Sequence, residues 1–386
     1  MFHLHSEIKK YPLLPYSQLV YDTTRWLPQV YRFGNTFRIK RGAKETERWK
    51  RAIEEALGNH PVFAMGVDWR GRQHAVPREE MFHGQYHRMF FQTEGEDLLI
   101  TCYMNRILGD GRSFEILMED VLRAYKGLPL ESDDYWGYLE YVAQQKQSKH
   151  YADSKAWLEN EFADETVPVR PTTDRRLWTW LPPKVGVHKA AYTDLHEKIQ
   201  SLATTEYLSV DGFFSLCAAL AIAEYCGTDS AALTWAYEGR ERPDEQRIFG
   251  SLHCDVPFQL NHISKIINQK SDLIREARNQ IRSGIAHSDY PYTLTKPYTQ
   301  RWNYAVNVLR IEDVEDMLRK TSLPMEVVSI PKQKYAYALL DVEIHEKAES
   351  LQLVYRYSAT HYKPESIRRF AALIRKYAEW ILEDNK

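Results

Sequence analysis

The chain has 386 residues, of which 44% are hydrophobic and 27% charged, a composition typical of a folded globular protein. Its net charge of −2 argues against a nucleic-acid-binding or polybasic membrane-surface protein. No apolar run approaches the length of a membrane-spanning helix, and residues 1–7 lack the charged-then-apolar plan of a signal peptide. We therefore expect a cytoplasmic protein with no nucleic-acid or membrane partner.

The sequence contains none of the common catalytic or metal-binding signatures. The four cysteines, Cys102, Cys217, Cys226 and Cys254, lie in dissimilar segments without CxxC spacing, so neither a zinc site nor a disulfide framework is predicted. There is no phosphate-binding Walker loop, no GxSxG elbow, no HExxH pair and no dinucleotide fingerprint. The chemistry must therefore be sought in a less common motif.

The first half of the chain predicts a strand, a tight corner and a helix in immediate succession. An amphipathic helix is expected over residues 43–57. Residues 98–107 are apolar enough for a buried strand, and the corner at 109–111 contains two glycines and an aspartate that can cap a helix. Apolar residues at helical spacing then predict a helix over 114–125, which Gly127 ends. Such a unit can direct polar groups from a rigid sheet into a cleft.

The second half continues to alternate between helical and strand patterns. A single helix is predicted over residues 135–161, followed by a proline-containing extended strap over 168–176. An alanine-rich helix is expected up to residue 225, a buried strand over 230–237, and a closing amphipathic helix over 366–382. We place a boundary between two lobes at the strap.

The corner carries a resemblance to a known family. Residues 105–111 read Asn-Arg-Ile-Leu-Gly-Asp-Gly, which resembles the HHxxxDG motif of the condensation-domain superfamily of nonribosomal peptide synthetases, relatives of chloramphenicol acetyltransferase. Asn105 and Arg106 stand at the two histidine positions, while Asp110 and Gly111 keep the Asp-Gly. Segments elsewhere resemble the family in the same order, from a "PLSPAQ"-type opening at 11–18 to an "iGxFVNTLPLR"-type stretch at 248–258.

The resemblance implies an α/β fold of two chloramphenicol-acetyltransferase-like lobes. The N-terminal lobe, residues 1–170, would carry the altered motif, and the C-terminal lobe would comprise residues 171–386. In the family the lobes form a V-shaped pseudo-dimer with a central tunnel, and the motif lies at its middle. Donor and acceptor, each tethered to a carrier protein through phosphopantetheine, enter the tunnel from opposite ends. No bound cofactor or metal is expected.

The altered motif changes the chemistry that the resemblance implies. The second histidine of the family positions the acceptor or takes its proton, whereas the guanidinium of Arg106 stays protonated and Asn105 does not titrate. For Asp110 the resemblance implies a structural role, bonding an arginine and holding the corner, rather than that of a base. Arg106 can pair with Asp110, can bind a phosphopantetheine phosphate or an acidic substrate, or can simply sit in a salt bridge; of these three, the simple salt bridge is our prediction.

Five further residues can be considered for a site. By resemblance, His253 and Cys254 lie near the tunnel, although adjacent strand residues point to opposite faces and are a poor nucleophile–base pair. A single cysteine there is more often a small buried apolar residue. His60 and His287 match family positions outside the corner, so structural roles are predicted. Ser113 begins the helix and is expected to act as a helix cap rather than as a nucleophile.

Two functions therefore remain open. The first is a condensation-type acyltransferase that joins a phosphopantetheine-bound acyl group to an amine or hydroxyl but lacks the usual catalytic histidine. The second is a non-catalytic docking module for a peptidyl or acyl carrier protein or a tailoring enzyme. Heterocyclization domains carry DxxxxD at this place, of which Asn105 and Asp110 give a partial likeness. The X domain of glycopeptide synthetases resembles this chain in having arginine at the second histidine position, and it docks an oxygenase.

Overall fold

The structure is a computed structural model that describes residues 9–26, 31–77, 80–176, 183–300, 305–330, 335–336 and 338–383. The chain forms two compact units. Unit 1 comprises Met1–Gln144, Glu238–His253 and Asp313–Lys332, and unit 2 comprises Gln145–Tyr237, Cys254–Glu312 and Gln333–Lys386. The predicted boundary between residues 170 and 171 lies inside unit 2 as the contacts define it. We call Glu238–His253 the crossover segment because it belongs to unit 1 although it lies in the sequence between two parts of unit 2.

Unit 1 is built on two antiparallel sheets. The larger has the strand order β11-β2-β6-β5 and the smaller the order β1-β4-β3. Their bounds are β1 Tyr11–Pro12, β2 Arg32–Ile39, β3 Met65–Val67, β4 Arg72–Ala75, β5 His87–Glu94, β6 Asp97–Asn105 and β11 Glu326–Ser329. The central strand β6 is the strand predicted over 98–107, and it leads directly into the corner.

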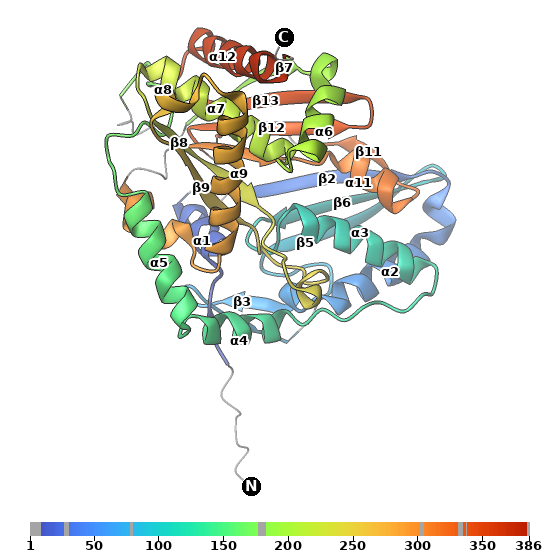
Figure 1. The fold of residues 1–386 in the computed structure, drawn as a ribbon. Helices are drawn as coiled ribbons and strands as arrows, with labels where there is room; N and C mark the ends of the chain where they lie inside the picture. The colour runs from blue at the N-terminus through green and yellow to red at the C-terminus, as the bar shows by residue number, and fades with distance from the viewer. Residues whose placement is uncertain are drawn as a thin grey trace. The chain divides into compact units, whose positions relative to one another are not determined.

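Helices cover one face of the larger sheet. The helices of unit 1 are α1 Pro15–Trp26, α2 Thr46–Asn59, α3 Gly111–Tyr125, α4 Tyr135–Gln145 and α11 Val314–Thr321. Figure 1 shows α2 and α3 side by side along the strands β2, β5 and β6. The helix predicted over 114–125 is α3, and it begins three residues earlier because Asp110 caps its first turn.

Unit 2 contains a six-stranded mixed sheet with the order β7-β13-β12-β10-β8-β9. The pairs β8–β10 and β10–β12 are parallel, and the others are antiparallel. The bounds are β7 Val185–Ala191, β8 Ala231–Tyr237, β9 Cys254–Leu260, β10 Val306–Arg310, β12 Leu340–Lys347 and β13 Ser350–Ser358. The unit also contains α5 Lys149–Glu161, α6 His196–Thr205, α7 Val210–Cys226, α8 Ile263–Ile266, α9 Lys270–Ala286, α10 Lys296–Gln300 and α12 Pro364–Leu382.

The helix α7 forms the centre of the core of unit 2. Ser209 caps its N-terminus through a hydrogen bond to the backbone N–H of Gly212, and Gly227 ends it in the left-handed conformation. Most of its side chains are buried, as an apolar surface all round the helix requires. Within the described ranges no single helix is long and apolar enough to cross a membrane, although the bent pair Thr193–Thr205 and Val210–Cys226 meets the length and composition criteria together.

The prediction of one helix over residues 135–161 is wrong. The segment forms two helices, α4 and α5, separated at residues 146–148. Ser148 causes the break because its hydroxyl accepts a hydrogen bond from the backbone N–H of Tyr151 at 3.1 Å, which starts a new helix. Residues 168–176 are without regular structure, as predicted for the strap.

A buried polar network attaches the crossover segment to the rest of unit 1. The imidazole of His60 lies 2.8 Å from a carboxylate oxygen of Asp133 and 3.2 Å from one of Asp120, and all three side chains are inaccessible to solvent. Asp133 also accepts a hydrogen bond from the backbone N–H of Phe249 at 3.0 Å, and Asp120 pairs with Arg247. The structural role predicted for His60 is therefore confirmed.

We expect His60 to stabilise the protein most strongly at mildly acidic pH. Burial opposes protonation, but the hydrogen bonds to Asp120 and Asp133 outweigh it and raise the pKa of His60 above its ordinary value. The stabilisation is complete below the unfolded pKa of about 6.5 and is lost as pH rises through the folded pKa. His60→Gln should therefore lose about 3 kcal/mol of unfolding free energy near pH 6 and less at higher pH.

Urea unfolding across this pH range measures the effect. The matched control is His83→Gln, because the side chain of His83 is 44% exposed and pairs only with Glu80 among the described charged groups. Equal losses in the two variants, or a loss from His60→Gln that grows with pH, would contradict the assignment.

Candidate functional site

The corner, residues 105–111, is held first by its own backbone. The side-chain oxygen of Asn105 accepts a hydrogen bond from the backbone N–H of Ile107 at 2.9 Å, closing the turn that follows β6. The backbone N–H of Arg106 donates to the carbonyl oxygen of Tyr31 at 3.0 Å. The hydroxyl of Ser17, on α1, donates to the carbonyl oxygen of Ile107 at 3.1 Å. The amide of Asn105 therefore shapes the turn.

Asp110 connects the corner to the helix α3. Its carboxylate accepts a hydrogen bond from the backbone N–H of Ser113 at 3.0 Å, and the hydroxyl of Ser113 accepts one from the backbone N–H of Asp110 at 3.2 Å. This reciprocal pair is a capping box. Ser113 therefore takes part in the cap, as predicted, with Asp110 as the capping residue itself.

Asp110 also holds the crossover segment. Its two oxygens lie 2.9 and 3.0 Å from the two terminal nitrogens of Arg240, a bidentate ion pair in which the Arg240 side chain is inaccessible to solvent. The backbone N–H groups of Leu252 and His253 donate to the same carboxylate at 2.9 and 3.2 Å. One carboxylate thus joins the corner, α3 and both ends of the crossover segment.

These contacts exclude Asp110 as a base. Burial alone would raise the pKa of its carboxyl group, but the Arg240 guanidinium and the other donors outweigh burial and lower it. The cation that pairs with Asp110 is Arg240, and the salt bridge predicted for Arg106 stays a prediction. An arginine that bonds Asp110 and holds the corner, the role implied by the resemblance, is present at residue 240.

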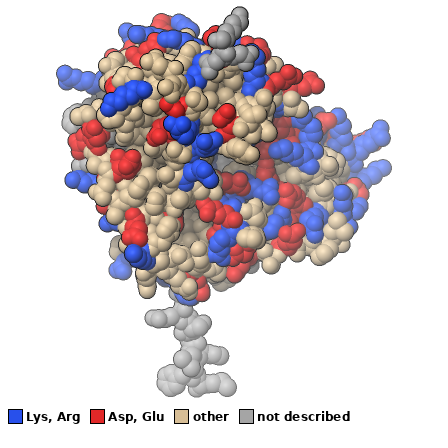
Figure 2. All heavy atoms as spheres, viewed as in Figure 1, with Lys and Arg blue, Asp and Glu red and all other residues tan. Residues whose placement is uncertain are grey.

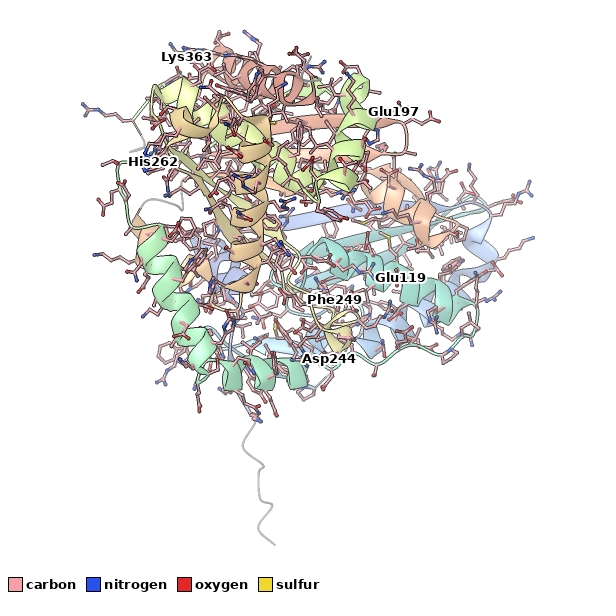
Figure 3. All side chains as sticks on the ribbon, in the orientation of Figure 1. Glu119, Glu197, Asp244, Phe249, His262 and Lys363 are labelled. Carbon is pink, nitrogen blue, oxygen red and sulfur yellow. The ribbon has the colours of Figure 1, made fainter. Side chains whose placement is uncertain are left out.

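Glycines allow the backbone segments to approach closely at two points. A Cβ atom at Gly109 would lie 2.8 Å from the ring of Phe249, which Figure 3 labels on the crossover segment. Gly239 has φ +70°, and a Cβ atom there would lie 2.3 Å from the carbonyl oxygen of Leu252. By contrast, Gly111 is the first residue of α3, and a Cβ atom there would meet nothing within 4 Å.

His253 is the imidazole beside the Asp110 carboxylate. Its Nδ1 atom lies 4.0 Å from an Asp110 oxygen and 3.5 Å from the hydroxyl of Ser251, and its ring meets the ring of Tyr16 edge-on at 4.0 Å between centroids. Burial lowers the pKa of His253 to about 4; the Asp110 carboxylate opposes this shift, and the charges of Arg106 and Arg240 add to it. The imidazole is therefore neutral at pH 7 but is a weak proton acceptor.

The boundary between the two units falls between two of the predicted site residues. Asn105, Arg106, Asp110, Gly111 and His253 all belong to unit 1, whereas Cys254 is the first residue of β9 in unit 2.

The sequence did not identify two residues that contact Asp110 and His253. Arg240 stands in a Gly-Arg pair that resembles one in the family, and Tyr16 lies in the opening segment that resembles the family. The described residues include no group of three or more His, Cys, Asp and Glu side chains arranged to hold a metal ion. Figure 2 shows Lys and Arg interspersed with Asp and Glu on the face in view, in keeping with the net charge of −2.

His287 belongs to unit 2. Its Nδ1 atom is 3.1 Å from the hydroxyl of Ser154, and its ring stacks on Trp157 at 4.4 Å between centroids. These packing contacts agree with the structural role predicted for this residue.

Comparison with known proteins identifies the family. The model of the condensation domain matches residues 87–385, which include the corner, the crossover segment and most of unit 2. The chain therefore belongs to the condensation-domain family of nonribosomal peptide synthetases.

Curated relatives are much longer than this chain. It is 21% identical over 305 residues to tyrocidine synthase 3 of Brevibacillus parabrevis, which covers 73% of this chain and 4% of that protein. It is 22% identical over 311 residues to enniatin synthase of Fusarium equiseti, covering 72% of this chain and 9% of that protein. The chain thus spans less than a tenth of these relatives.

Solved structures show the same fold at low sequence identity. The epimerization domain from the third module of tyrocidine synthetase B matches with a TM-score of 0.75 and 14% identity, covering 97% of this chain and 96% of that chain. The EpoB cyclization-docking bidomain from Sorangium cellulosum matches with a TM-score of 0.76 and 13% identity, covering 97% and 84%. The X-domain from teicoplanin biosynthesis matches with a TM-score of 0.75 and 12% identity, covering 97% and 96%. The α/β, chloramphenicol-acetyltransferase-like fold predicted from the sequence is confirmed.

Proposed function

We propose that this protein is a condensation-type unit of nonribosomal peptide or related acyl-transfer biosynthesis in which ordinary amide and ester formation is impaired. It would bind acyl groups tethered through phosphopantetheine to a carrier protein. One observation carries this proposal. The bonds that hold the corner through Asp110 and Arg240 are present, but no residue at the motif positions can accept a proton efficiently.

Each candidate base fails for a separate physical reason. The amide of Asn105 closes its own turn and does not titrate. The guanidinium of Arg106 stays protonated at any pH at which the protein is folded. Asp110 is buried and paired with Arg240, which lowers its pKa. His253, with a pKa of about 4, is too weak a base to replace an imidazole of ordinary pKa.

We expect the missing histidine to lower the rate of acyl transfer strongly without abolishing it. A positioned general base is worth roughly 10²–10⁴-fold in rate. Holding two tethered substrates together contributes without a base only when both are held in reactive geometry, and the histidine that positions the acceptor in the family is replaced by Arg106. We therefore expect residual transfer that lies close to the rate in the absence of the protein.

The second candidate function is a docking module without catalysis, which would bind a carrier protein or a tailoring enzyme. The observation that favours it is that the Asp110–Arg240 scaffold is kept while the proton acceptor is missing. A protein with this combination keeps the fold and its surfaces but lacks a group that the reaction needs. The X-domain from teicoplanin biosynthesis, which shares the fold, gives this candidate a structural parallel.

Binding and transfer measured on the same samples separate the two functions. Acyl-loaded carrier proteins are incubated with the unaltered chain and a mixture of amine and alcohol acceptors. Intact-mass spectrometry reports transfer, and surface plasmon resonance reports carrier binding. We expect saturable binding with transfer no more than about tenfold above the rate without protein, which is well below the contribution of a general base. Transfer faster by about 10²-fold or more would overturn the impairment, and absence of binding would overturn the carrier role.

A further inference from the structure

The two faces of the six-stranded sheet of unit 2 differ in chemistry. Successive residues of a strand point to opposite faces, and one set, which includes Leu233, Val256 and Val342, packs with α7 and α12 in the hydrophobic core. We call the opposite side of the sheet the polar face. Strands β12, β10, β8 and β9 contribute polar side chains to it, namely Asp341, Glu343, Asn307, Thr234, Asp255 and Gln259. This face therefore suits a polar ligand better than a hydrocarbon chain.

Several of these polar groups have partners within unit 2. One oxygen of Glu343 lies 2.6 Å from Nε of Arg356 on β13, and the other lies 3.1 Å from the imidazole of His345. The hydroxyl of Thr234 donates to the carbonyl oxygen of Val306 at 3.3 Å. For these side chains the unit itself supplies the counter-charge or the hydrogen-bond partner.

Asp255, on the edge strand β9, differs from them. It is partly exposed, and its carboxylate forms no hydrogen bond or ion pair with any described residue. Ala236 stands opposite it on β8, is also partly exposed, and offers only a methyl group. Burial is the one cause that shifts the pKa of Asp255, which rises to about 6. At pH 7.5 the side chain is therefore mostly an ionised carboxylate without a counter-charge.

Gln259, four residues further along the same face of β9, carries a second acceptor without a donor. Its side chain is 3% exposed, its Oε1 atom has no hydrogen-bond partner among the described residues, and its Nε2 donates to Asn261 at 3.1 Å. Ala232 stands opposite Gln259 and packs in a hydrophobic cluster with Leu158 and Phe162, so this end of the face is covered. Both unsatisfied groups of β9 are acceptors, so a ligand of this face must supply donors.

We propose that Asp255 binds the primary ammonium group of a ligand at the exposed end of the polar face. An ionised carboxylate held partly out of water without a counter-charge costs free energy, and an ammonium group supplies both a positive charge and three donors. A perturbed carboxylate that no structural contact uses is typical of a functional site. That the ammonium is carried on a chain attached to pantetheine rests on the proposed function, whereas binding of the cation itself does not.

Calorimetric titration of the unaltered chain at pH 7.5 with two pantetheine thioethers tests the proposal. S-(6-aminohexyl) pantetheine ends in an ammonium group, and S-heptyl pantetheine ends in a methyl group of similar size. Neither compound can be transferred, so the result does not depend on catalysis. The ammonium compound should bind about tenfold more tightly or better, as expected for a hydrogen bond to a charged group. Hexylamine, which lacks pantetheine, is titrated in parallel.

The variant Asp255→Asn removes the charge and keeps the shape of the side chain. It should abolish the preference for the ammonium compound and the binding of hexylamine, without lowering the unfolding midpoint at pH 7.5, because the lost carboxylate has no partner. The matched control is Asp153→Asn, at an exposed residue of α5 in the same unit, and it should keep the preference. In the unaltered protein the preference should grow from pH 5 to pH 7.5 as Asp255 ionises.

Three results would overturn the proposal. They are equal affinity for the two thioethers, a preference that survives in Asp255→Asn, and a lower unfolding midpoint of that variant, which would mean that Asp255 has a structural partner. Absence of carrier binding in the assay of the proposed function would overturn the carrier role but would leave the hexylamine result unchanged. The two failures can therefore be told apart.

Discussion

Replacing Arg240 by methionine should lower the free energy of unfolding by about 3–5 kcal/mol at neutral pH. The Arg240 side chain is fully buried and forms both bonds of the pair with Asp110. Without it, Asp110 keeps its backbone donors but becomes a buried carboxylate with no cation paired to both of its oxygens. Because this carboxylate joins α3 and the crossover segment, we expect the loss to be among the largest for any single polar side chain of unit 1.

The destabilisation caused by Arg240→Met should depend on pH, in a direction that can be checked. The pKa of Asp110 is lowered in the folded protein, so the stabilisation is present above the unfolded pKa of about 3.9 and is lost as pH falls through the folded value. The difference between the unaltered protein and Arg240→Met should therefore be largest near pH 7 and shrink on acidification.

Urea unfolding followed by tryptophan fluorescence measures this difference, and a neighbouring arginine supplies the control. Arg242 lies two residues away, its side chain is 36% exposed, and it pairs with Asp244 at the surface. Exposed pairs of this kind contribute about 0–1 kcal/mol. If Arg240→Met destabilises the protein no more than Arg242→Met, then Asp110 does not organise the corner.

Replacing Arg106 by histidine should raise acyl transfer by roughly 10²-fold or more, the contribution of a positioned general base. An imidazole of ordinary pKa, about 6.5, is largely neutral at pH 7.5 and can accept the proton of an amine or hydroxyl acceptor. Two hydrogen bonds that hold this turn are made by the Arg106 backbone N–H and the Asn105 side chain. The substitution therefore changes the chemistry at the corner while those bonds remain.

The carrier assay with intact-mass readout measures the gain, and the rate should increase with pH around the pKa of the new imidazole. The matched control is Arg88→His, because Arg88 is exposed on β5 and lies outside residues 105–111. A gain confined to Arg106→His would support an acyltransferase that has lost its base. No gain in either variant, with carrier binding retained, would contradict this and favour the docking module.

Individual strands and helices could be predicted because they depend on residues that are close together in the sequence. An apolar run predicted the strand β6 and helical spacing predicted the helix α3; the strand ends two residues before the predicted bound, and α3 gains a first turn that Asp110 caps. The merged helix over 135–161 was wrong because a single serine, Ser148, caps a new helix inside a continuous pattern. The resemblance that named the family was likewise carried by contiguous residues of the corner.

The contacts of Asp110 could not be predicted in the same way. Its partner Arg240 is 130 residues away in the sequence, and the resemblance implied only that some arginine would bond Asp110. The neutral state of His253 follows from burial and from the charges of Arg106 and Arg240, none of which can be read from its neighbours in the chain.

The sequence by itself determined the family and the chemistry available at the motif, because a guanidinium or an amide cannot become a good base in any fold. The tertiary structure decided which groups meet: Asp110 with Arg240, and His253 with the Asp110 carboxylate. The physical reason is that side-chain chemistry belongs to each residue, whereas pairing, burial and pKa depend on segments that only folding brings together.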